Sequence, residues 1–294
     1  MSRRADEAVG GRSQVLDVKI ERLARDVSFL VGQGIIIDAA HRRALSLPSD
    51  VAGAESAATR ARRFMRAPAG PLLDMQRACE RVNLLAFSLD AAEGSDAAYV
   101  EVGNLGVALV NGRMDPGRRR FSLAHELGHH LFGDAYAPEV SIGGGGEAER
   151  LINAFAIHLL LPRKEVTKSW GATSEHGTRL AAVGISVKFR ASWTATCSQL
   201  CTLGLIDETE RIRLASASPT GADFIALGER WEAELDAPAV PPEYGKRVLG
   251  AYQAGKLTAA RTSELLWGTV TIEDLPEQLA DPLDSLRPEF DHLS

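Results

Sequence analysis

The sequence feature that most constrains this chain is the stretch His125-Glu126-Leu127-Gly128-His129. Residues four apart on an α-helix share one face, so the two histidines can offer their imidazole nitrogens to a single metal ion. Glu126 is rotated by about 100° around such a helix and can reach a water molecule held by that ion. Apolar residues recur at steps of three and four around the motif, which predicts that it lies on a helix over residues 116–132.

A third ligand must come from elsewhere, because a catalytic zinc site normally takes three protein ligands and leaves the fourth position to water. The best candidate is Glu149, at the start of a second apolar helix expected over residues 147–161. Asn153 follows one turn later on the same face and can accept the N–H of a ligand imidazole. The sequence therefore predicts His125, His129 and Glu149 as metal ligands and Glu126 as the catalytic acid/base.

Other acidic residues near the motif are weaker candidates for the third ligand. Glu147 faces elsewhere on the second helix, and Asp134 follows directly after the first. Ala135 stands where a metzincin has its third histidine, which excludes that variant. For Glu149 itself, the alternative is a solvated acid favoured by the N-terminal end of the helix dipole.

The remaining histidines are not expected to bind the metal. His130 lies about 100° from His129 around the helix, and it is either a group on the substrate side or, as we favour, a structural neighbour. His158 lies on the opposite face of its helix from Glu149. The other three have no partner at ligand spacing: His41, His176 and His292.

Zinc in such a site lowers the pKa of its bound water to about 7, so that Glu126 can take the proton and return it to a leaving amine. The predicted reaction is hydrolysis of a peptide bond. The group that stabilises the oxyanion stays open among Tyr136, His130 and the run Arg118–Arg120, although a solvated helix face is favoured for the arginines. Imidazole ligands favour Zn²⁺ over Mn²⁺, and metal availability can override that preference.

The fold expected from the patterns is α+β: a mostly helical core with a small antiparallel sheet, and helical extensions at both ends. The expected helices lie at residues 15–31, 54–65, 72–81, 116–132, 147–161, 192–203 and within 243–267. The expected strands lie at 84–88, 97–102, 106–110 and near 211–215.

Together, the segments Phe121-Ser-Leu-Ala-His125-Glu-Leu-Gly-His129 and Glu149-Arg-Leu-Ile-Asn153-Ala-Phe155-Ala-Ile-His-Leu-Leu-Leu161-Pro162 resemble the ImmA/IrrE metallopeptidase family. The resemblance covers roughly residues 56–215 and implies a zincin-like core with the same ligands and acid/base. It also implies a partner, because members cut a helix-turn-helix repressor and so release stress-response or mobile-element genes. Residues 179–206 resemble the small winged-helix-like element that follows the metal helices in the family.

Four regions follow from these patterns and from the resemblance. Residues 1–66 form an N-terminal helical extension that could hold a degenerate helix-turn-helix, and residues 67–178 form the zincin-like metallopeptidase core. Residues 179–215 form the winged-helix-like element, and residues 216–294 a C-terminal helical region. Residues 1–80 carry a net charge of +3 and the rest −9, a mild contrast that leaves DNA binding by the first region open.

Composition favours a cytoplasmic protein. The sequence has no apolar run long enough to span a bilayer, and the Arg-containing start is not followed by an apolar segment, so neither membrane insertion nor export is expected. Three cysteines cannot form a disulfide framework, and Cys197 and Cys201 are expected to pack on one helix face rather than to sense redox state.

The sequence thus favours a zinc endopeptidase that cleaves a protein, namely a helix-turn-helix repressor or an antitoxin. A second hypothesis is a transcriptional regulator that uses the zincin fold as a sensing or dimerising scaffold. A third and weaker one is an adaptor whose C-terminal helices dock a partner.

Overall fold

A computed structural model describes residues 14–38, 44–91, 96–133, 145–173, 175, 177–229 and 232–279. The predictions made for His41, Asp134, Ala135, Tyr136, His176 and His292 lie outside these residues. The order of elements is α1(Gln14–Gly32), α2(Val51–Phe64), α3(Met75–Glu80), β1(Leu84–Leu89), β2(Ala97–Val102), β3(Leu105–Asn111), α4(Pro116–Phe132), α5(Gly145–Leu160), α6(Arg163–Thr173), α7(Thr178–Phe189), α8(Trp193–Thr202), α9(Glu208–Ala215), α10(Gly221–Leu227), α11(Pro242–Gln253) and α12(Ala259–Leu265).

The three strands form one sheet in the order β1-β3-β2, which confirms the α+β class. Strands β2 and β3 are antiparallel, but β1 and β3 are parallel, with Leu84 opposite Gly106. The sheet is therefore mixed, and the expectation of a wholly antiparallel sheet was wrong in this respect. The chain reverses direction before and after β2, so β1 and β3 run in the same direction. Because β3 lies between β1 and β2 in the sheet, β1 and β3 become parallel neighbours.

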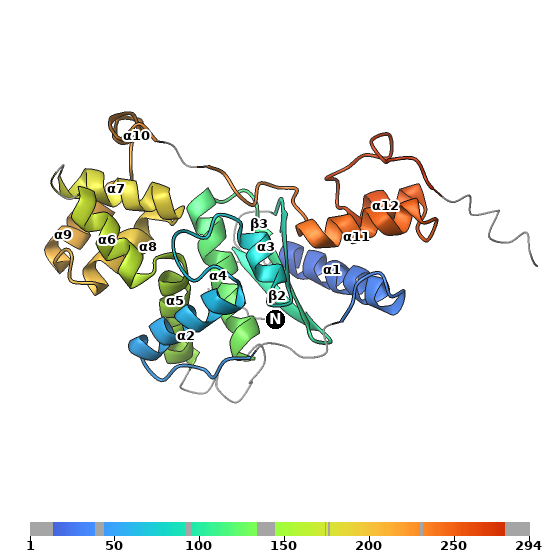
Figure 1. The fold of residues 1–294 in the computed structure, drawn as a ribbon, viewed down its shortest axis with the longest axis horizontal. Coiled ribbons are helices and arrows are strands. Elements are labelled where there is room, and N and C mark those ends of the chain that lie inside the picture. Colours follow the sequence, from blue (N-terminus) through green and yellow to red (C-terminus); the bar gives the residue numbers. More distant parts are fainter. Residues whose placement is uncertain are drawn as a thin grey trace, which may run out of the picture.

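Alternate residues of β1 and β3 face two different cores. Ala86, Ala108 and Val110 belong to one cluster, which also contains buried residues of α2, α4, α5 and α8. Phe87 and Val107 belong to the other, which is closed by α1, α11 and α12. Figure 1 shows these layers: α4 and α5 lie on one side of the sheet, and α1, α11 and α12 lie on the other.

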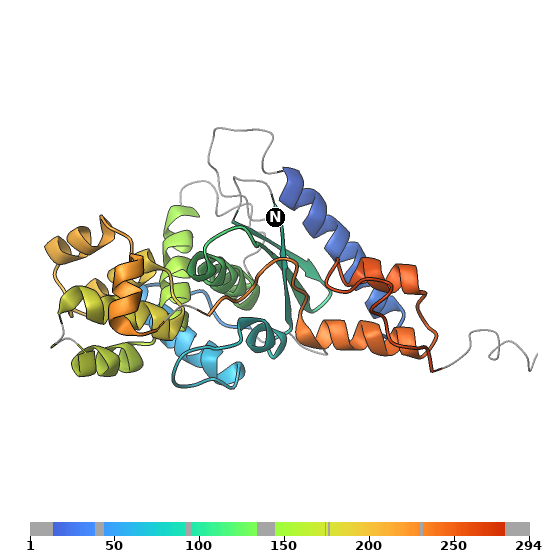
Figure 2. The same cartoon turned by 90° about the horizontal axis from the view of Figure 1, so that it is seen from above.

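The metal-motif helix and its partner are built as predicted. Helix α4 spans Pro116–Phe132, begins with Pro at its first turn and ends at Gly133 in the left-handed conformation. Helix α5 spans Gly145–Leu160 and packs against both α4 and α2. The helices that follow, α6 to α10, form the end of the molecule opposite α11 and α12, as both views show (Figures 1 and 2).

Helix α9 replaces the strand expected near residues 211–215. The side chain of Asp207 caps its N-terminus by accepting from the backbone N–H of Glu210, and two Glu-Arg pairs at i,i+3 line its surface. Residues 179–215 consequently contain the helices α7, α8 and α9 and no strand.

The two described helices of residues 1–66 pack in different places. Helix α1 belongs to the core with α11 and α12, whereas α2 packs against α5 in the other core. They do not form the compact pair that a helix-turn-helix requires. The division of the chain into four regions stays a prediction.

Candidate metal centre

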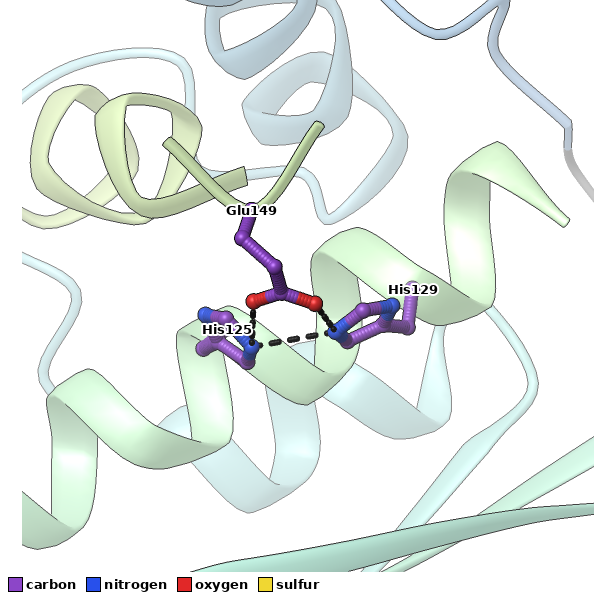
Figure 3. A group of neighbouring side chains, drawn as sticks. All are labelled: His125, His129 and Glu149. Carbon is purple, nitrogen blue, oxygen red and sulfur yellow. Dashed lines mark hydrogen bonds and ion pairs between the residues drawn. The ribbon is translucent and has the colours of Figure 1, made fainter. Parts of the chain in front are cut away.

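Side chains from α4 and α5 converge at one point between the two helices. The Nε2 atoms of His125 and His129 are 3.0 Å apart, as expected for residues one turn apart on the same helix face. Glu149 reaches down from the first turns of α5, with one carboxylate oxygen 3.3 Å from His125 Nε2 and the other 3.6 Å from His129 Nε2. Figure 3 shows the three side chains, which the sequence proposed as ligands, pointing toward one another.

The distances and the donor types fit a single divalent cation. Two ligand atoms each about 2.0–2.1 Å from a tetrahedral zinc ion lie about 3.3 Å apart. The three observed separations of 3.0, 3.3 and 3.6 Å bracket that value. Two imidazoles with one carboxylate are a donor set of catalytic zinc sites. This trio could therefore hold a metal ion.

A hydrogen bond from Asn153 orients the first histidine. His125 Nδ1 lies 3.0 Å from Asn153 Oδ1, which confirms the contact predicted from the spacing of Glu149 and Asn153. Because the amide oxygen only accepts, Nδ1 carries the proton and donates it, and the lone pair of the neutral ring is left on Nε2. The nitrogen that faces His129 and Glu149 is therefore the one able to bind a cation.

The centre is buried on the α4 side and open on the α5 side. His125 is 6% exposed and His129 is 4% exposed. The side chain of Glu149 is 43% exposed, so solvent reaches the centre along this carboxylate. Glu126, also buried, follows His125 directly on α4 and is not one of the three converging ligands.

The neighbouring histidine, His130, has a structural environment. It is fully buried; Nε2 lies 2.8 Å from the carbonyl oxygen of Val82 and Nδ1 lies 2.9 Å from the hydroxyl of Tyr99. A Cβ atom at Gly106 would come within 2.6 Å of the His130 ring, so only glycine fits there without displacement. These contacts agree with the structural role favoured for His130.

His158 points away from the centre. It is buried, its Nδ1 lies 3.1 Å from the side-chain amide of Gln199, and burial lowers the pKa of its imidazole. The structure therefore places it outside the ligand set, as expected.

The arginine run at the start of α4 is not the solvated face that the sequence favoured. Arg118 is exposed and pairs with Asp96 at 2.9 Å, but Arg119 and Arg120 are 3% and 0% exposed. Both buried guanidinium groups bind residues 232–236, a segment that crosses their face of α4. Arg119 donates to the carbonyl of Leu235, and Arg120 pairs with Glu234.

A groove of about 1360 Å³ lies at the N-terminal end of α4. Its lining includes Gly117, Phe121, Ile157, Trp193, Phe224 and Ile225. Phe121 is one helical turn before His125, and Ile157 is one turn after Asn153, so the groove begins beside the metal centre. The sequence does not reveal this groove, because its walls come from α4, α5, α8 and α10.

These features together define a candidate metallopeptidase centre. Residues 79–200 match the family model described as IrrE N-terminal-like domain, a family of metal-dependent peptidases. This match agrees with the resemblance drawn from the two motifs.

Among curated proteins, none matches the sequence of the chain. Among solved structures, one that matches is a Mycobacterium tuberculosis transcriptional regulator, with 18% sequence identity and a TM-score of 0.39. The match covers 61% of this chain and 51% of that one, so the chain spans about half the length of that protein. Within the described ranges, no helix combines the length and the apolar character needed to cross a membrane.

Proposed function

We propose that this chain is a zinc-dependent endopeptidase that cuts a protein substrate. The observation that carries the proposal is the convergence of His125, His129 and Glu149, with Glu126 adjacent on the same helix. The match of residues 79–200 to a peptidase family model supports the reaction type.

The roles of the residues follow from their positions. His125, His129 and Glu149 would hold the ion, and Asn153 keeps His125 in the tautomer that presents Nε2. Zinc, when bound, supplies a Lewis acid and lowers the pKa of its water. Glu126 accepts a proton from the attacking water on its carboxylate and later donates it to the nitrogen of the leaving amine. We favour Zn²⁺ over Mn²⁺ because two of the three ligands are imidazoles.

The substrate proposed is a helix-turn-helix repressor or an antitoxin, whose cleavage would release gene expression. This part of the proposal rests on the resemblance to the ImmA/IrrE family. We place the reaction in the cytoplasm, and the three cysteines support this, since Cys79, Cys197 and Cys201 are all free thiols.

The test is to incubate the purified chain with Zn²⁺ and a repressor encoded beside its gene. We expect two defined fragments, and we expect Glu126→Gln to lower the rate by about 10²–10⁴-fold while zinc content stays at the wild-type level. A repressor that stays intact at every metal concentration would count against the proposal. DNA binding that survives Glu126→Gln and is lost on removing residues 1–66 would instead support the scaffold hypothesis.

A further inference from the structure

Beyond the metal centre, we infer that the groove between α4, α5, α8 and α10 binds an extended stretch of the substrate and selects a bulky apolar side chain near the scissile bond. This inference rests on the proposed peptidase function and adds a substrate preference to it. The volume of the groove, about 1360 Å³, exceeds the roughly 300–1,000 Å³ typical of small-molecule sites. This size favours a polypeptide as the occupant.

The groove begins about one helical turn from the metal centre along two helices. Phe121 and His125 lie four residues apart on α4, which corresponds to about 6 Å along the helix axis. An extended polypeptide covers that distance in about two residues. A substrate chain whose scissile bond lies at the metal centre therefore places residues two to four positions away in the groove.

The walls of the groove are apolar on opposite sides. Phe121 and Ile157 come from the two metal-site helices, and Trp193 comes from the start of α8. The opposite wall is α10, which has no buried residue, and Ile225 on it is 79% exposed while lining the groove. An exposed isoleucine facing other apolar residues across an open groove is available to contact an apolar side chain of a bound substrate.

Polar contacts hold α10 in place together with the partial packing of Phe224 and Leu227 against the core. Arg179 binds both carboxylate oxygens of Asp223 at 3.0 and 2.8 Å and donates to the carbonyl oxygens of Ala217 and Ser218. Thr220 and Asp223 form a capping box at the start of the helix. The wall is thus fixed without burying Ile225, which stays exposed at the groove.

The experiment measures binding and cleavage separately. Two fluorescent 12-residue peptides of Gly and Ser are compared, one with Leu-Phe at its centre and one with Ser-Ser. Binding is measured by fluorescence anisotropy to the zinc-loaded Glu126→Gln chain, so that it does not depend on turnover. Ile225→Asp is the test substitution, and Ile212→Asp is its matched control, because Ile212 is 56% exposed on α9 and lies outside the groove lining.

We expect the Leu-Phe peptide to bind at least about tenfold more tightly than the Ser-Ser peptide, and Ile225→Asp to remove most of that difference. Ile212→Asp should change the affinity by less than about twofold. Equal binding of the two peptides, no binding of the Leu-Phe peptide up to millimolar concentration, or equal effects of the two substitutions would overturn the inference.

Measuring cleavage with Glu126 intact, rather than with Glu126→Gln, distinguishes a failure of this inference from a failure of the proposed function. If the Leu-Phe peptide binds as expected, but neither it nor a protein substrate is cut, the groove stands as a binding site and the peptidase proposal fails. If peptides are cut without preference for the apolar one and without an effect of Ile225→Asp, the peptidase proposal stands and the groove inference fails.

Discussion

Asn153 Oδ1 accepts a hydrogen bond from His125 Nδ1 at 3.0 Å, which joins the third turn of α5 to the metal-motif helix. Because this bond sets the tautomer of His125, we expect Asn153→Ala to weaken zinc binding by about 10–100-fold. Asn153→Asp keeps an acceptor at the same place and should retain most of the affinity. Competition with a chromogenic chelator measures both constants, and an unchanged affinity in Asn153→Ala would refute this role.

The close contact between α4 and α5 depends on Gly128. A Cβ atom there would lie 2.9 Å from Ile152 and 3.2 Å from Phe155, both on the helix that carries Glu149. Overpacking costs about 1–3 kcal/mol and outweighs the gain of up to about 1 kcal/mol in helix propensity. We expect Gly128→Ala to lower both the free energy of unfolding and the zinc affinity.

Gly171 in α6 supplies the control for that substitution. No atom lies within 4 Å of a Cβ built there, so Gly171→Ala should be neutral or stabilising by up to about 1 kcal/mol. Urea unfolding of the two variants compares them directly. Equal effects would show that the contact at Gly128 does not hold the two helices at this distance.

Arg120 should be essential for stability, although it lies outside the metal centre. It is fully buried and pairs with Glu234, and it also donates to the carbonyl of Leu72. Removing one partner of a buried ion pair leaves the other charge uncompensated, so Arg120→Met should cost about 3–5 kcal/mol. Adding Glu234→Gln should recover part of the loss.

Arg118 is the matched control for Arg120, two residues away on α4. Its side chain is 59% exposed and its ion pair with Asp96 is at the surface. Arg118→Met should therefore change the free energy of unfolding by at most about 1 kcal/mol. A loss below 1 kcal/mol in Arg120→Met as well would mean that the buried ion pair contributes little.

The buried imidazole of His158 makes stability depend on pH. Burial lowers the pKa of His158, an effect that Glu55 opposes and Arg163 reinforces. In the unfolded chain the same group titrates near pH 6.5, so below that pH the unfolded state takes up the proton first. The free energy of unfolding is therefore unaffected by this group above about pH 6.5. Below that pH it falls, and the titration of His158 lowers it by at most about 2 kcal/mol at pH 5.

Urea unfolding between pH 7 and 5, in the presence of a chelator, tests this dependence. We expect the free energy of unfolding of the wild-type chain to fall more steeply than that of His158→Gln. Identical slopes would show that His158 does not carry the effect.

Sequence patterns predicted those features of the fold that depend on residues close together in the sequence. The bounds of α4 followed from Pro116, Gly133 and the apolar repeat between them, and four-residue spacings on two helices led to the three side chains that the structure brings together. Alternating Ile212 and Leu214 instead suggested a strand. The overlooked signal was the Asp207 cap followed by Glu-Arg pairs, which favours a helix.

Other features depend on segments that are distant in the sequence. Strand β1 pairs with β3 rather than with its neighbour in sequence, β2, and no pattern within the strands reports this pairing. Arg119 and Arg120 looked solvated because the segment that covers them, residues 232–236, lies more than a hundred positions later in the chain. The groove was missed for the same reason, since α10 completes it.

Zinc stoichiometry and affinity test most directly whether His125, His129 and Glu149 hold one catalytic ion. We expect the wild-type chain to bind one Zn²⁺ per chain, His129→Ala to lose that stoichiometric zinc, and His158→Gln to keep it. A wild-type chain without stoichiometric zinc, or a His129→Ala chain that binds one Zn²⁺ with unchanged affinity, would contradict this assignment.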